Sequence, residues 1–471
     1  MKIIRIAKFS LGGLLGLSVA AQAAGSAKPT LAGSVARAWA DLGVAGGVHS
    51  ETLRTFRSRA LTQGIGPDAS GAGLRCAADF GDTDAARTDF LGCLAEAGRG
   101  AFTEPFFARL FELRIARANH VPSIEEAKSL NLLAYVEDLT RAMEHQRNGG
   151  GLWFVRGQGY LEGSTYFDYP FEDGDIVLGL GNTSISASIA SATNPRSRYS
   201  HAFLVRKERD GLVTLEALVE KGVRKFPREH FAADRYQVLT VLRWKDESSR
   251  KRIATAASGA GLGYADAKLG YDINMDLKDS SRMFCTELVA RAYADASGLS
   301  MDEILPELSL VRSDLAYKYV SQVGVRNRRV IAAGDLLNSP FLDVVAEWRR
   351  ADDLDRAWKM WSFGALFYER IEQGFTVRPD PVLASAPAGA WLLQLFPSLL
   401  VPEARVVPEG LSPWAVSVMG TLELHVFRPS IHFVEDQVQA GRGFAQLDLA
   451  ELRGGLDFAF QTHGLIPAVF R

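Results

Sequence analysis

The feature of this sequence that most constrains its fold is a series of four short apolar segments between residues 174 and 244. Each segment has the length of a strand, and β-branched and aromatic residues are common in them. They read GDIVLGLG, HAFLVRK, LVTLEALVE and YQVLTVLRW, and ERDG joins the second to the third as a hairpin. Two amphipathic segments follow, SSRKRIATAASGAG and CTELVARAYADASG, with the loop LGYDINMDLKDSSRMF between them. The pattern predicts four strands followed by two helices.

The rest of the chain differs from this region on both sides. Ahead of it the pattern is helical, and Ser123 followed by Glu126 is the capping-box signature of a long amphipathic helix. The RNGGG sequence at Arg147–Gly151 marks a domain boundary. The segment after the region mixes an aromatic-rich helix with Pro-containing loops and carries no chemical motif. We therefore expect a helical region at residues 24–150, a second domain at 151–350 and an extension of unassigned role at 351–471.

The N-terminal segment, residues 1–23, has the three parts of a secretory signal peptide. Lys2, Arg5 and Lys8 precede the apolar run LGGLLGLSVA, and AQA has the small-x-small form of a signal-peptidase site. The apolar run is shorter than the about 20 residues that a spanning helix needs. No cysteine follows it that could accept a lipid anchor. The sequence predicts an exported, periplasmic protein that is cleaved after Ala23 and then has no transmembrane span.

Charge and histidine spacing bear on partners and cofactors. With a formal net charge of −2 over 471 residues, the chain has no excess of positive charge that would indicate nucleic acid as a partner. The histidines are scattered, and His425 and His432 lack the spacing and context of a zinc site. The sequence predicts neither nucleic-acid binding nor a metal or other cofactor, and it gives no indication of the oligomeric state.

The chain contains three cysteines, which fall into two groups. Cys76 and Cys93 lie in the same N-terminal segment and could form a disulfide in an oxidising compartment, although the spacing alone does not fix their geometry. Cys285 would then be a free thiol directly ahead of the apolar periodicity of a helix. A helix N-terminus stabilises a thiolate and lowers its pKa. The alternative is a small apolar residue that the helix buries.

His201 opens a strand that is otherwise apolar, and the next strand carries Glu216. A hairpin loop of the two residues Asp210–Gly211, or of the four residues Glu208–Gly211, places both side chains on one face of the sheet, whereas a loop of three residues separates them. Glu220 has the same parity as Glu216 and could replace it, and either glutamate could instead be a solvated charge on an edge strand. His201 could likewise only bond a neighbouring carbonyl. A nucleophilic thiol needs a base and an orienting polar group, so Cys285, His201 and Glu216 together predict a catalytic triad.

The order of these segments resembles that of the circularly permuted papain-like hydrolases of the YiiX/YaeF type. The resemblance is carried by GDIVLGLG, YSHAFLV, LEALVEKGV, YDINMDLKDSSRMFCTELVARAY and GDLLNSPFLDVV, and its most specific parts are SHAFLV and FCTELV. It covers roughly residues 167–345. These enzymes are relatives of the NlpC cell-wall peptidases and of lecithin:retinol acyltransferase, with the histidine strand ahead of the cysteine helix. The resemblance implies an α+β fold in which an antiparallel sheet packs with helices.

The resemblance also assigns roles to single residues. Cys285 aligns with the family nucleophile, His201 with the general base and Glu216 with the polar residue of the next strand. Tyr271 and Asp272 match a recurrent YD in the preceding loop, which is either structural or in contact with substrate. Asp175 in GDIV matches a structural turn or cap.

These roles imply a cysteine hydrolase that forms an acyl-enzyme, with the backbone N–H of Cys285 as an oxyanion donor. Relatives among the NlpC peptidases imply an amide of a cell-wall peptide as the substrate. The relatives of lecithin:retinol acyltransferase imply deacylation of, or acyl transfer from, a lipid or lipoprotein instead. A third possibility is a catalytically inactive binding or scaffold module that keeps the fold.

Overall fold

A computed structural model of the protein describes ten stretches of the chain together with shorter helical pieces between residues 123 and 137, between 364 and 374, and at 417–418. The ten stretches are residues 71–97, 103–118, 151–155, 159–162, 169–181, 184–194, 197–219, 221–232, 236–306 and 308–350. The predicted signal peptide, Glu220, the two histidines at 425 and 432, and most of the C-terminal extension lie outside the described residues.

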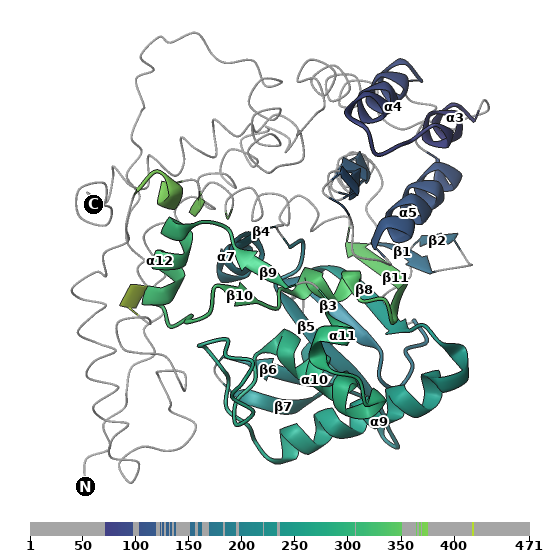
Figure 1. Ribbon diagram of the computed structural model, residues 1–471. Coiled ribbons are helices and arrows are strands. Elements are labelled where there is room, and N and C mark those ends of the chain that lie inside the picture. The colour runs from purple at the N-terminus through teal and green to yellow at the C-terminus, as the bar shows by residue number, and fades with distance from the viewer. Residues whose placement is uncertain are drawn as a thin grey trace, which may run out of the picture.

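An eight-stranded sheet forms the centre of the described structure, with the order β2-β1-β11-β8-β3-β5-β6-β7 (Figure 1). Every neighbouring pair in it is antiparallel. The strands are β1 (Gly151–Val155), β2 (Gly159–Glu162), β3 (Ile176–Gly181), β5 (His201–Glu208), β6 (Gly211–Leu218), β7 (Gly222–Pro227), β8 (Tyr236–Trp244) and β11 (Leu342–Arg350). A smaller sheet has the order β10-β9-β4, with β4 (Thr193–Asn194), β9 (Ser309–Val311) and β10 (Arg329–Val330).

The helices of the described residues flank both sheets (Figure 1). They are α3 (Ala72–Ala78), α4 (Asp84–Ala97), α5 (Glu104–Ala118), α7 (Ser184–Ser191), α8 (Arg228–Ala232), α9 (Glu247–Asp266), α10 (Cys285–Ser297), α11 (Met301–Ile304), α12 (Asp314–Gln322) and the 3-10 helix η3 (Ala333–Asn338). None of the helices within these residues is long and apolar enough to cross a bilayer. The α+β architecture is the predicted one, and the four predicted strands are β3, β5, β6 and β8.

The middle of the sheet is buried on both faces, which is why its strands read as nearly continuous apolar runs. Ala202 and Leu204 of β5 belong to the core beneath α9 and α10. Phe203 and Val205, on the opposite face, belong to a second core. His201 has the same parity as Phe203, so the side chain that opens β5 starts on the face of the second core.

The hairpin between β5 and β6 determines which side chains meet at the end of β5. Glu208 pairs with Gly211, so the loop is the two residues Arg209–Asp210, one position earlier than a loop at Asp210–Gly211. A two-residue loop keeps the predicted parity. Thr214 pairs with Val205, and Glu216, two residues further along, lies on the same face of the sheet as His201.

The N-terminal helices are joined to each other and to the sheet. Cys76 of α3 and Cys93 of α4 form a disulfide, with their Cα atoms 5.6 Å apart. Ser123 and Glu126 make the two reciprocal hydrogen bonds of a capping box, as their spacing predicts. Arg114 of α5 reaches β11, where its guanidinium bonds the buried carboxylate of Glu347.

Candidate active site

Cys285 is the first residue of α10 and is buried with a free thiol. The helix begins there because Phe284 is extended, while Leu288, Val289 and Ala292 form the buried stripe of an amphipathic helix. The side chain of Phe284, the residue directly ahead of the helix, forms no capping hydrogen bond. The first N–H groups of the helix therefore keep their capacity to bind a negatively charged oxygen.

His201 lies between the thiol and a carboxylate. Its Nε2 is 3.0 Å from Oε2 of Glu216, and on its other side the neighbouring Cys285 thiol contributes to its raised pKa. Because Nε2 is taken by the carboxylate, the nitrogen that serves the thiol is Nδ1. In the neutral ring the proton stays on Nε2, and Nδ1 is free to accept the proton of the thiol.

Glu216 is held in place from a second side. Its side chain is 1% exposed, and its Oε1 accepts a hydrogen bond of 2.6 Å from the Thr214 hydroxyl. The two residues are two positions apart on β6 and therefore share a face of the sheet. One carboxylate oxygen thus bonds threonine and the other bonds the imidazole, which fixes both the rotamer of Glu216 and the plane of the histidine ring.

The pKa values of the three groups are displaced toward a charged pair. Burial alone lowers the pKa of His201, but hydrogen bonds and charge attraction from Cys285 and Glu216 outweigh it and raise that pKa to about 10. Burial raises the pKa of the Cys285 thiol, yet its hydrogen bond and attraction to His201 lower the pKa overall. Backbone N–H groups of Ala202 and Thr286 add to this lowering. Against its own burial, Glu216 has a lowered pKa because of His201.

Three residues that support the site were not identified from the sequence: Thr214, Tyr236 and Gly179. Thr214 carries a signal that could have been found, since it lies on the same face as Glu216 two residues earlier. The ring of Tyr236 stacks on that of His201 with an interplanar angle of 3°. Gly179 of β3 is the cross-strand partner of His201 and makes room for the ring of Tyr236, because a Cβ at this glycine would be 2.5 Å from that ring. This last relationship depends on strand pairing and has no signature in the sequence.

The structure separates the roles of Tyr271 and Asp272. Tyr271 lines the pocket at Cys285, and after burial the charge of the thiolate is the largest cause of its raised pKa. The carboxylate of Asp272 accepts backbone N–H bonds from Asn274 and Asp276, so it helps to shape the loop. Asp175 is structural, as predicted, because its carboxylate bonds the guanidinium of Arg243.

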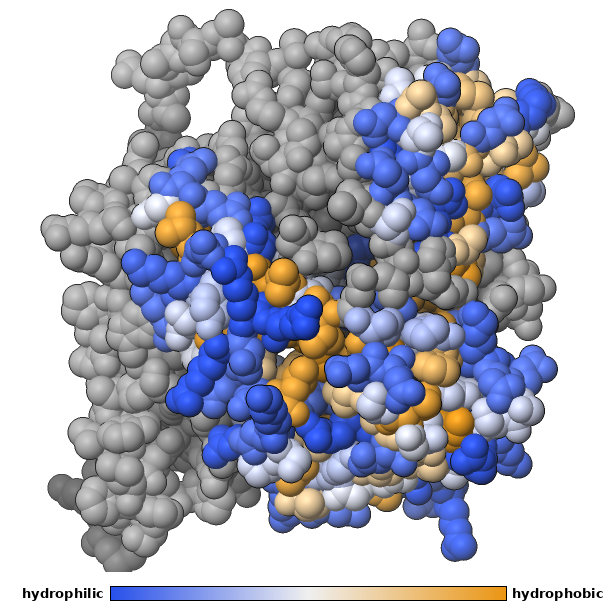
Figure 2. Space-filling view, viewed as in Figure 1, coloured by the Kyte–Doolittle hydropathy of each residue, from blue (hydrophilic) through white to orange (hydrophobic). Residues whose placement is uncertain are grey.

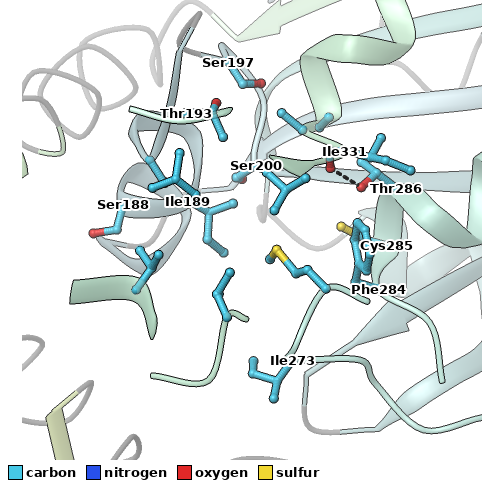
Figure 3. Close-up of a pocket in the computed structure, with 18 of the residues that line it drawn as sticks. Ser188, Ile189, Thr193, Ser197, Ser200, Ile273, Phe284, Cys285, Thr286 and Ile331 are labelled. Carbon is cyan, nitrogen blue, oxygen red and sulfur yellow. Dashed lines mark hydrogen bonds between the residues drawn. The ribbon is translucent and has the colours of Figure 1, made fainter. Parts of the chain in front are cut away.

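A pocket opens beside Cys285 and is almost entirely apolar (Figure 3). Its lining comes from α7, the loop before β5, the loop before α10, and the segment from β9 to η3. Among the residues that the structure describes, no acidic or basic side chain lines it. Apolar members are Ile189, Val219, Ile273, Met275, Phe284, Val311, Val320, Val323, Val325, Val330 and Ile331. The described part of the chain also contains no cluster of three or more His, Cys, Asp or Glu that could hold a metal ion.

Residues 170–346 match the model of a known family, described as permuted papain-like amidase enzyme, YaeF/YiiX, C92 family. The match includes His201, Glu216 and Cys285 and ends within β11. None of the curated proteins compared with the chain matches it. The family match confirms the resemblance seen in the sequence and the papain-like character of this domain.

Proposed function

Taking residues 170–346 as a permuted papain-like domain of the YaeF/YiiX type, we propose that the protein is a cysteine amidase that cleaves the amide of an apolar acyl chain. The observation that carries the catalytic part is the position of His201 between the Cys285 thiol and the carboxylate of Glu216, to which its Nε2 is hydrogen-bonded. The family description supports an amidase as the reaction class.

The proposed reaction has two stages. The Cys285 thiolate attacks the carbonyl carbon, a C–S bond forms, and the resulting oxyanion lies at the backbone N–H of Cys285, the first residue of α10. Collapse of this intermediate breaks the C–N bond, and the protonated His201 gives its Nδ1 proton to the leaving amine. Neutral His201 then takes a proton from water, which attacks the thioester and releases a carboxylic acid. The proton on Nδ1 and the thiolate are restored for the next turnover.

The lining of the pocket supports an apolar acyl group over a cell-wall peptide. A cell-wall peptide carries carboxylate and ammonium groups, and burying such a charge without a partner is costly. The described residues that line the pocket offer these groups no opposite charge. An aliphatic chain instead gains about 25 cal/mol for each Å² of apolar surface that it buries. A lipid or lipoprotein whose acyl chain is amide-linked therefore fits the pocket best.

Two substrates, octanoyl-p-nitroanilide and peptidoglycan, test this proposal. We expect the full chain to release p-nitroaniline from octanoyl-p-nitroanilide, and Cys285→Ser to lose this activity. Transfer of the octanoyl group to an added primary amine would identify an acyltransferase. Release of peptides from peptidoglycan without action on the octanoyl compound would favour the cell-wall substrate. No covalent adduct and no product from either substrate would favour the binding or scaffold module.

Export to the periplasm is part of the same proposal and rests on the N-terminal residues 1–23 and on the disulfide. A Cys76–Cys93 bond is stable in an oxidising compartment such as the periplasm. Fractionation of cells that express the full chain tests this. We expect a processed protein in the periplasmic fraction, whereas an unprocessed protein in the cytoplasmic fraction would contradict export.

A further inference from the structure

One wall of the apolar pocket is built by residues 309–330, which contain β9, α12 and β10 and are here named the pocket wall. In Figure 1 these elements lie together with α7 and β4, beside the large sheet. Its inner side is apolar. Val311 of β9, Val320 of α12 and Val330 of β10 are buried and line the pocket.

The outer side of the same wall exposes leucines next to cations. Leu310 is 47% exposed and is the cross-strand partner of Arg329 in the small sheet. Leu315 is 40% exposed and lies three residues before Lys318 on α12, so the two side chains are neighbours on the helix surface. In Figure 2 the surface over α12 and β9 accordingly mixes strongly hydrophobic and strongly hydrophilic residues.

The pocket wall is also basic, in contrast to the whole chain. Residues 309–330 contain five Lys or Arg and one Asp, a net charge of +4, whereas the chain as a whole has −2. Arg312 is paired with Glu372 and Arg328 with Asp314. The other three cations form no ion pair with any residue that the structure describes: Lys318, Arg326 and Arg329.

The pocket reaches the surface close to these side chains. Ile189 of α7 lines the pocket and is nevertheless 43% exposed, so it lies where the pocket meets solvent. The chain runs from α7 directly into β4, whose Asn194 is the cross-strand partner of Leu310. The exposed leucine of the small sheet and the exposed isoleucine of the pocket are therefore close neighbours in the fold.

We propose that the outer side of the pocket wall docks onto an anionic lipid bilayer, with Leu310 and Leu315 in its acyl region and Lys318, Arg326 and Arg329 at the lipid phosphates. Interleaved leucines and unpaired cations are the combination that binds an anionic membrane interface. A docked protein would have the pocket at the membrane surface, where an acyl chain can leave the bilayer for the pocket. This inference names the source of the substrate and rests on the proposed cleavage of an acyl amide.

Cosedimentation of the full chain with two kinds of vesicle tests the docking. The vesicles are pure phosphatidylcholine, and phosphatidylcholine with 30% phosphatidylglycerol as a roughly physiological anionic fraction. We expect binding to the anionic vesicles, and a loss on the order of 100-fold in Lys318→Glu/Arg326→Glu/Arg329→Glu, since each cation near the surface contributes about fivefold. Leu310→Ser/Leu315→Ser should lower the affinity for these vesicles about tenfold, because serine does not bury the apolar surface that the two leucines bury.

The matched control is Arg209→Glu/Lys251→Glu/Arg252→Glu, which changes the net charge equally on exposed residues away from the pocket wall. This control should bind as the original protein does. Equal losses in the control and in the Lys318 variant, or unchanged binding in the leucine variant, would overturn docking through this surface. The N-terminal apolar segment is the same in all proteins, so it does not affect the comparison.

Hydrolysis of octanoyl-p-nitroanilide in free solution, measured on the same samples, separates the two proposals. Hydrolysis without vesicle binding would overturn the docking and leave the amidase standing. Vesicle binding that depends on Leu310 and Lys318, without hydrolysis, would overturn the amidase and leave the docking surface standing.

Discussion

Cys285 and His201 can form a thiolate–imidazolium pair because each has a pKa shifted from its ordinary value. The lowered pKa of the thiol and the raised pKa of the imidazole, about 10, define a pH range in which the thiolate and imidazolium coexist. The range ends on the alkaline side when His201 loses its proton. It ends on the acidic side when the thiolate is protonated. Glu216 extends the range at its alkaline end, because it raises the pKa of His201.

Replacement of Glu216 by Gln tests this widening. The amide keeps the shape but removes the charge that favours imidazolium, so the pKa of His201 should fall and the alkaline limit of amide hydrolysis, which needs the protonated ring, should move to lower pH. Loss of the orienting carboxylate should reduce kcat/KM by about 10²- to 10⁴-fold. Thr214→Val is the matched control, because it removes only one hydrogen bond to the same carboxylate and should have a much smaller effect. An unchanged pH profile in Glu216→Gln would contradict the role of this residue.

Glu287, two positions after the nucleophile, carries a second pH effect. Burial raises its pKa to about 7, although the ion pair with Arg291 opposes this. Between the unfolded value of 4.5 and about 7 the folded protein binds more protons than the unfolded chain, so this contribution to stability is full below pH 4.5 and is lost as the pH rises through 7. Between pH 5 and pH 8 the free energy of unfolding should fall in both proteins, and the fall should be about 1–3 kcal/mol smaller in Glu287→Gln than in the original protein. Thermal melts at both pH values measure this, and parallel losses would contradict it.

The strands that were predicted and those that were missed differ in what buries them. β3, β5 and β8 are apolar on both sides of the sheet and can be read from composition alone. β11 also runs through the middle of the sheet, but its sequence LDVVAEWRR includes a carboxylate whose burial depends on Arg114 of a distant helix. β7 ends in proline and contains two basic residues. Pairing between distant segments explains both strands, and a single sequence does not reveal it.

The proximity of Cys285, His201 and Glu216 was predictable for a related reason. Cys285 and His201 each stand at the start of an element, and a short hairpin fixes the parity of Glu216. These features are local in sequence. The apolar pocket was not predictable, because its lining comes from at least five separate elements and loops that only the fold brings together.

Gly222, the first residue of β7, packs against the loop that leads to Cys285. It has a φ of 67°, and a Cβ there would lie 2.3 Å from the carbonyl oxygen of Leu269. The next residue, Val223, donates its N–H to that same oxygen at 2.8 Å. Gly222→Ala should therefore destabilise the protein by about 2 kcal/mol or more and slow alkylation of Cys285.

Gly259→Ala is the matched control for this change. Gly259 is an exposed residue within α9, and no atom lies within 4 Å of the added Cβ. Alanine favours a helix over glycine by about 1 kcal/mol, so this variant should be more stable. Denaturant titration measures both. Equal stabilities of the two variants would contradict a tight contact at Gly222.

The N-terminal helices and the papain-like domain meet at buried ionic groups. Arg114 of α5 pairs with Glu137 at 3.1 Å and with Glu347 of β11, and Glu347 also accepts a hydrogen bond from Thr240 of β8. The Thr240 hydroxyl bonds the hydroxyl of Tyr199, which lines the pocket two residues before His201. A chain of polar contacts thus runs from the N-terminal region through the sheet to the active site.

Removal of Arg114 should therefore affect the molecule as a whole. Arg114→Ala removes a cation that is paired with two buried carboxylates, and we expect a loss of about 3–5 kcal/mol in the free energy of unfolding. Arg109→Ala on the same helix breaks only an exposed pair with Glu112 and should cost less than about 1 kcal/mol. Denaturant unfolding of both variants measures the difference. Similar costs for the two would show that the helix is not anchored through this contact.

The alkylation rate of Cys285 by iodoacetamide between pH 4 and pH 10, in the original protein and in His201→Ala, tests the activated pair most directly. Cys76 and Cys93 are bonded to each other, so of the three cysteines only Cys285 reacts under non-reducing conditions. We predict rapid alkylation that persists into mildly acidic pH and collapses in the variant. A single titration near the free-thiol pKa of about 8.5, unchanged by the substitution, would contradict the pair and with it the proposed amidase.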